Sequence, residues 1–168
     1  MFKSQKRPIV VPQAEHARFA GILASLWGNA DFDRPALDFQ SFIKGVTFHD
    51  RGYGQLDYYP LGEVDRETWL SIQRRGILLS ADDAISNVVS LLHIKRLLQN
   101  SGTAQPTDDL VALADEQIAA SIGKSGLARE AFEWADKITQ WCDDVAFDFS
   151  FEANVHRSPQ VYARTDSQ

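Results

Sequence analysis

The sequence contains a single cysteine, Cys142, among its 168 residues. No disulfide bond can form within one chain, which excludes the small secreted domains that disulfides hold together and agrees with a reducing compartment. The chain is nevertheless long enough to bury a hydrophobic core without disulfides or metals. We expect one domain over residues 1–168, with an extended arm at 1–12 and a loose tail at 157–168.

Long apolar runs are also absent. No stretch approaches the roughly 18 consecutive apolar residues of a membrane span. The basic start of the chain is followed by only three apolar residues, IVV at 9–11, which is too short for the core of a signal peptide. Internal repeats and low-complexity segments are lacking as well. The sequence therefore predicts a cytoplasmic protein that does not contact membranes.

An excess of positive charge is the third absence. The 17 lysines and arginines are outnumbered by 23 acidic residues, giving a net charge of −6. Binding to a phosphate backbone needs clustered basic side chains, so this balance argues against a nucleic-acid partner. A small anionic substrate is still compatible with the charge, because a bound metal can outweigh a diffuse negative surface.

Helical periodicity is what the sequence does contain. Apolar residues recur at spacings of three and four, and no segment shows sustained alternation. We predict an all-α bundle of about six helices, in which Asp65 caps the third. A loop is expected at 101–107, and residues 7–11 form either a short strand or part of the arm. The predicted helices cover approximately residues 13–27, 36–50, 65–80, 82–100, 108–123 and 125–149.

Three of the four histidines lie in phase with apolar helix stripes: His16, His49 and His93. A lone histidine on such a face is more often a hydrogen-bonded core residue than a metal ligand. Three of them, one followed directly by Asp50, favour a metal site, because imidazoles and carboxylates are common ligands. An inward-facing Asp50 also requires a cation, since burying an unpaired carboxylate is costly.

A further ligand is expected from the last helix. Asp136 and Asp143 are seven residues apart and share a face with Phe132 and Phe147, whereas Asp144 falls on a solvated stripe. Helical phase therefore favours Asp143 or Asp136 as a pocket-lining carboxylate. The alternative, a helix with two solvated faces, is equally compatible with the periodicity.

Several of these residues carry a family resemblance. The order EHARFAGILASLW, then FIKGVTFHDRG, then an aspartate on a late helix resembles the HD-domain superfamily of metal-dependent phosphohydrolases. The first hundred residues look most like a bacterial family, within or near that superfamily, that has only an unknown-function label. The matching positions in this sequence are His16-Ala17, Trp27-Gly28-Asn29, His49-Asp50, Gly52-Tyr53 and Asp57.

The resemblance implies an HD-like helical fold and a ligand set for one divalent metal. His16, His49 and Asp50 match three ligands, and the late ligand matches Asp143 best and Asp136 next. His93 stands where some members add a histidine for a second metal or for the substrate. The metal would be Mn, Fe, Mg, Ni or Zn.

The function expected from this resemblance is hydrolysis of a phosphate ester or related small anion by a metal-activated water. Asp50 would act as ligand and catalyst. Asp57 either orients the water or caps a turn in the YYP loop. Arg51 and Tyr53 are candidates for the substrate site, although Arg51 also suits a solvated face.

The sequence departs from the superfamily pattern at Tyr53, where many active members have a phosphate-holding lysine. This departure weighs against hydrolysis of phosphomonoesters or nucleotides. Two alternatives therefore stay open: a non-catalytic domain that binds a metal or ligand, and a diiron oxygenase of HD type. A homodimer is compatible with the aromatic residues, among them Trp69.

Overall fold

The computed structural model describes residues 1–60, 62–101 and 107–153, and in these residues it is an all-α bundle, as predicted. No helix in these ranges is long and apolar enough to cross a membrane. A short 3-10 helix, η1 (Gly54–Tyr58), follows the second α-helix. The six α-helices are α1 (Gln13–Ser25), α2 (Phe39–Thr47), α3 (Arg66–Leu78), α4 (Ala84–Asn100), α5 (Asp108–Ser125) and α6 (Arg129–Phe151).

Aspartate caps explain where three helices begin. The predicted cap at Asp65 is confirmed, because its carboxylate accepts a hydrogen bond from the Thr68 N–H at 2.8 Å. Such a cap satisfies one of the amide groups that a first helical turn leaves unpaired. Asp38 and Asp83 cap α2 and α4 in the same way. Helix α2 therefore starts at Phe39, three residues later than the sequence predicts.

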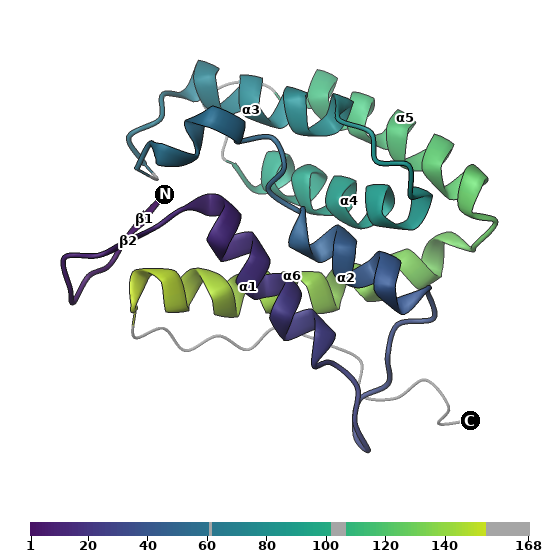
Figure 1. Ribbon diagram of the computed structural model, residues 1–168. Helices are drawn as coiled ribbons and strands as arrows, with labels where there is room; N and C mark the ends of the chain where they lie inside the picture. Colours follow the sequence, from purple (N-terminus) through teal and green to yellow (C-terminus); the bar gives the residue numbers. More distant parts are fainter. Residues whose placement is uncertain (61, 102–106, 154–168) are drawn as a thin grey trace.

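The helices enclose two hydrophobic clusters. α1 packs on α2 and α6 around Ala20, Phe42 and Ile138, while α4 packs on α3 and α5 around Leu91 and Ile118. Figure 1 shows α3, α4 and α5 together in one half of the molecule, α1 and α6 in the other, and α2 between them. Because α4 also contacts α2 and α6, it joins the two halves.

The N-terminal arm is folded, not merely extended. Its residues form a two-stranded antiparallel ribbon of β1 (Phe2–Lys3) and β2 (Val10–Val11). Phe2 is 1% exposed and packs its ring against those of Phe147 and Phe151 on α6. The ribbon thus covers one end of the bundle. The predicted tail at 157–168 and most of the predicted loop at 101–107 lie outside the described residues.

A close crossing of two glycines holds the turn after α2 against α3. A Cβ atom at Gly52 would lie 2.3 Å from the Ile72 carbonyl oxygen and 3.1 Å from the Gly76 nitrogen, both backbone atoms that cannot give way. This turn carries the His49-Asp50 pair, so the crossing also fixes the site described below.

We expect Gly52→Ala to lower the free energy of unfolding by about 1–3 kcal/mol, the usual cost of overpacking. The measurement is chemical denaturation of the purified variants. Gly123→Ala is the matched control: Gly123 lies within α5 with no atom near its would-be Cβ. That substitution should stabilise by up to ~1 kcal/mol through helix propensity. Equal effects at the two glycines would contradict the crossing.

Candidate metal centre

The three in-phase histidines are all buried, with exposed fractions of 0–1%. Helix α1 contributes His16, whose Nε2 lies 3.0 Å from the Asp143 Oδ1 and 3.9 Å from the Asp50 Oδ2. On its other side, the His16 ring packs against Phe2 at a centroid distance of 4.6 Å. The N-terminal ribbon therefore shields this histidine from water.

His49 and Asp50 lie in the turn that directly follows α2, at the inner end of its apolar stripe. The His49 Nδ1–H donates to the Val46 carbonyl oxygen at 2.7 Å, which orients the ring. Its Nε2 then points between two carboxylates, 3.4 Å from Asp143 Oδ1 and 3.5 Å from Asp50 Oδ2. This fully buried nitrogen meets both carboxylates at ion-pair distance, without the geometry of a hydrogen bond.

The late aspartate in the cluster is Asp143. Its two oxygens face His16 and His49 on one side and His93 on the other. Asp136, the second candidate, instead forms a short ion pair with Arg96 of α4. The structure thus brings Asp143 together with the histidines and places Asp136 one contact further out.

Arg96 links that outer ion pair to His93. Its Nη2 donates to the His93 Nδ1 at 3.1 Å, and a guanidinium can only donate. A neutral His93 therefore carries its hydrogen on Nε2, which lies 3.5 Å from Asp50 Oδ1. Burial and the charge of His49 lower the pKa of His93 and favour this neutral form, against the opposite effect of Asp143.

The donor atoms are arranged as a metal site would require. Two sets of three offer ligand atoms within 4.8 Å of one another, namely His16, His49 and Asp143, and His49, Asp50 and His93. Imidazole nitrogens and carboxylate oxygens in such a cluster suit Mn, Fe or Zn. The hydrogen bond from His49 Nδ1 to a carbonyl is the usual support of a ligating histidine. The buried His49 Nε2 between two carboxylates supplies the test of fit, since a bound cation would satisfy all three groups at once.

In the metal-free protein, a proton on His49 takes that position. Burial alone would lower the pKa of His49, but the carboxylates of Asp50 and Asp143 outweigh it and raise the pKa to about 10. In return, His49 and His93 lower the pKa values of Asp50 and Asp143 well below the ordinary value, although burial acts to raise them. The site thus stabilises positive charge at its centre.

Asp57 is not part of the cluster. Its carboxylate accepts hydrogen bonds from the backbone N–H groups of Gln13 and Ala14, the latter at 3.2 Å. It therefore caps the N-terminus of α1 and fixes the helix that carries His16. Asp57 thus caps a helix that lies 43 residues away in the sequence. The alternative prediction had it cap a turn in the YYP loop.

The two remaining predicted residues have different positions. Arg51 donates to the Gly76 carbonyl at 2.8 Å and to Asn87 Oδ1 at 2.9 Å, so it ties α3 to α4 instead of lying on a solvated face. Its burial lowers its pKa to about 10. Tyr53 is 8% exposed and lines a cavity beside the cluster. Burial, with a smaller effect of Asp50, raises the pKa of its hydroxyl, which stays neutral at physiological pH.

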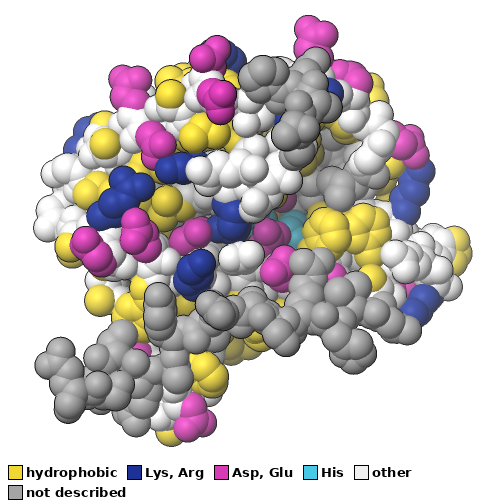
Figure 2. Space-filling view, turned by 180° about the vertical axis from the view of Figure 1, so that it is seen from behind, with side chains coloured by type: hydrophobic (Ala, Val, Ile, Leu, Met, Phe, Trp, Pro, Cys, Tyr) yellow, Lys and Arg dark blue, Asp and Glu magenta, His cyan; other side chains and the backbone are white. Residues whose placement is uncertain are grey.

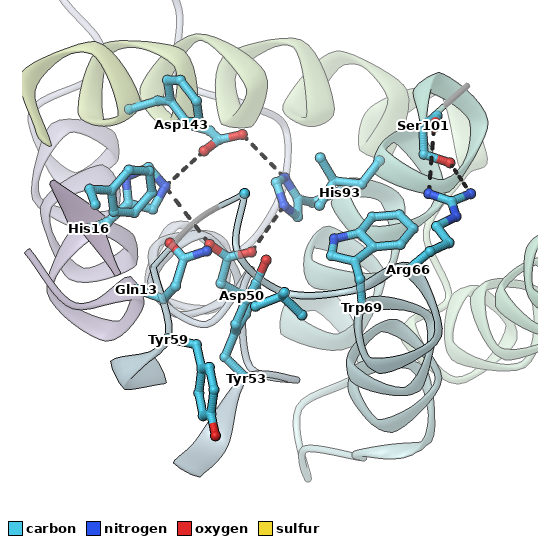
Figure 3. Close-up of a pocket in the computed structure, with 15 residues that line it drawn as sticks. Gln13, His16, Asp50, Tyr53, Tyr59, Arg66, Trp69, His93, Ser101 and Asp143 are labelled. Atoms are coloured by element: carbon cyan, nitrogen blue, oxygen red, sulfur yellow. Dashed lines mark hydrogen bonds and ion pairs between the residues drawn. The ribbon is translucent and has the colours of Figure 1, made fainter. Parts of the chain in front are cut away.

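That cavity has a volume of about 430 Å³ and opens onto the surface seen in Figure 2, where a histidine lies in a hollow flanked by acidic side chains. His16, Asp50, His93 and Asp143 form one wall (Figure 3). Sequence reasoning missed the other wall. Its residues include Phe2, Gln13, Arg66, Trp69 and Ser101.

A signal for Gln13 was available, because it precedes His16 by three residues and so shares its helix face. Trp69, considered above for a dimer surface, lies in the cavity wall. No local pattern marks Phe2 or Ser101, which reach the cavity only through the ribbon and the end of α4.

One family model matches the chain, over residues 1–166, and its description is "Protein of unknown function (DUF3891)". No curated protein matches the chain. No solved structure matches it either. The relation to the HD-domain superfamily stays a prediction.

Proposed function

We propose that this chain, which belongs to the DUF3891 family, is a metal-dependent hydrolase of a phosphate ester or related small anion, with a fold of the HD-domain type. The observation that carries the proposal is the fully buried His49 Nε2, which faces Asp50 and Asp143 without a hydrogen bond. A cluster that only stabilised the fold would hold this nitrogen at hydrogen-bond distance, whereas its spacing of 3.4 and 3.5 Å from the two carboxylates suits ligands grouped around one ion.

In this proposal His16, His49, Asp50 and Asp143 hold the metal. A divalent ion in that place would polarise an anionic substrate and make a water molecule nucleophilic at neutral pH. The protein's own groups do the remaining work. The neighbouring cavity admits one small molecule, and its largely apolar walls limit the water around it.

His93 and Tyr53 are the groups placed to handle the substrate anion. Arg96 keeps the hydrogen of His93 on Nε2, directed at the acidic side of the cluster, so His93 can donate a hydrogen bond to a substrate oxygen. The neutral Tyr53 hydroxyl stands where a lysine is expected in the superfamily, and it offers a hydrogen bond without a positive charge. This set favours a substrate of low negative charge, such as a phosphodiester, over a phosphomonoester.

The test is metal analysis of the purified protein followed by assays with bis(4-nitrophenyl) phosphate and 4-nitrophenyl phosphate. We expect about one metal per chain, and turnover of the diester that falls at least ~100-fold in kcat/KM for His49→Ala, which removes a ligand. Asp144→Asn, which removes the neighbouring charge outside the cluster, should retain activity.

Two outcomes would contradict the proposal in different ways. Protein without metal, and without thermal stabilisation by added Mn or Fe, would remove the metal centre itself. Bound metal with no turnover of any phosphoester would favour a binding domain, or an oxygenase if an iron–oxo absorption band develops.

A further inference from the structure

One polar atom in the wall of the cavity, the side-chain oxygen of Gln13, is buried without a hydrogen-bond partner. Gln13 as a whole is 2% exposed. The side chain of Gln13 lies next to the Tyr53 hydroxyl, whose pKa it acts to lower against the larger effect of burial. Figure 3 shows the Gln13 side chain beside Asp50 and Tyr53. The amide therefore presents a buried acceptor without a donor, next to the cluster of histidines and aspartates.

The position of Gln13 is built in from two sides. The Asp57 carboxylate accepts a hydrogen bond from its backbone N–H. On the other side its side chain lies beside Tyr53, which lines the same cavity as Trp69. Since a buried acceptor without a donor is costly, this arrangement is understandable if a ligand supplies an O–H or N–H group there.

A cation lies at another part of the same wall. Of the described residues that line the cavity, Arg66 is the only lysine or arginine. Its guanidinium lies over the Trp69 ring at 4.6 Å, and its Nη2 donates to the Ser101 hydroxyl at 2.9 Å. In Figure 3 Trp69 lies between the cluster and Arg66. Stacking and a hydrogen bond hold the guanidinium in the orientation in which it meets the cavity.

Much of the remaining wall is apolar. The apolar residues of the lining are Phe2, Val64, Trp69, Leu97 and Phe147. Such a surface suits the hydrocarbon or aromatic body of a ligand, while the few polar groups set its orientation. Guanidinium groups bind carboxylates with strong, charge-assisted hydrogen bonds.

We propose that the cavity recognises a small ligand at three points: a phosphate-like group at the metal cluster, a neighbouring hydroxyl or N–H donor at Gln13, and a carboxylate at Arg66, joined by an apolar body. This inference rests on the proposed function for the first point only. It names the substrate class as a hydroxylated or aminated phosphate ester with a carboxylate at its far end, and it assigns specificity to Gln13 and Arg66.

The experiment uses phosphonates, which resist hydrolysis, so binding is measured whether or not the protein turns over esters. The probes are the monomethyl ester of benzylphosphonate, which like a phosphodiester carries one negative charge, its α-hydroxy derivative and its 4-carboxy derivative, titrated calorimetrically into the Mn-loaded protein. We expect each added group to tighten binding by tenfold or more. For each added group the relevant quantity is the ratio of the Kd without the group to the Kd with it. Gln13→Leu should bring this ratio close to one for the hydroxyl, and Arg66→Gln should do so for the carboxylate.

Matched variants keep the test decisive. Arg74→Gln removes the same charge from an exposed position on α3 and should preserve both ratios. Arg66→Lys, which keeps a positive charge, should restore part of the carboxylate ratio, and Gln13→Met replaces Gln13→Leu if the latter does not fold. Ratios near one in the wild type, or ratios that persist in the variants, would overturn the proposal, as would failure to bind any probe.

The failure of the proposed function can be told apart from the failure of this inference. Selective phosphonate binding without hydrolysis of the corresponding phosphate esters would refute the hydrolase and leave the recognition intact. If the rate of hydrolysis did not depend on the hydroxyl, on the carboxylate, or on substitution of Gln13 and Arg66, the three-point recognition would be refuted and the hydrolase would stand.

Discussion

Asp143→Asn is expected to weaken metal binding by at least ~100-fold, because it removes a carboxylate that faces all three histidines. The simplest measurement is the shift of Tm on adding Mn. A ligand at 100 times its Kd stabilises by about 2.7 kcal/mol, or roughly 5–11 °C for a domain of this size, so the wild type should show such a shift. At the same Mn concentration Asp143→Asn should show almost none.

Asp136→Asn is the matched control, since it makes the same change on the same helix seven residues earlier. Asp136 pairs with Arg96 and lies outside the cluster, so its variant should keep the Mn shift close to that of the wild type. If Asp143→Asn kept the Tm shift, or if only Asp136→Asn lost it, Asp143 would not be the ligand. Either result would refute the centre as described.

These two aspartates show what helical phase can predict about the site and what it cannot. Phase alone placed His16, His49 and His93 inside, because a polar residue on an apolar stripe is carried into the core with it. It also placed Asp143 with Phe147, which lines the same cavity. It could not separate Asp143 from Asp136, because both lie on one face of α6 and the partner that distinguishes them, Arg96, belongs to another helix.

Residues outside regular helices were less predictable. The register between Asp50 and Asp57 passes through turns and η1, so helical phase could not place Asp57 at the start of α1. Phe2 reaches the site only because β1 pairs with β2 and folds over α6. Such positions depend on contacts between distant segments, and a local pattern contains no information on them. Phe2 and Ser101, which line the cavity, were missed for that reason.

The metal-free protein should lose stability as the pH rises, and His49 is the cause. Its pKa is about 10 in the folded protein, against about 6.5 in an unfolded chain. Between these values the folded state binds one proton more, so the free energy of unfolding falls by about 1.4 kcal/mol per pH unit. This contribution is complete below pH ~6.5 and is lost as the pH passes the folded pKa. Urea denaturation in EDTA from pH 6.5 to 8.5 measures it.

Saturating Mn should remove this slope, because the ion replaces the proton at His49 Nε2 and the folded state then holds no extra proton. By the same linkage, Mn affinity should rise up to tenfold per pH unit over the same interval. His49→Gln in EDTA is the control, since it keeps every other titrating group and lacks the imidazole. The site would be misassigned if the wild type and His49→Gln had the same slope, or if Mn left the wild-type slope unchanged. A slope that only EDTA-treated wild type shows would identify His49 Nε2 as the atom where proton and metal compete.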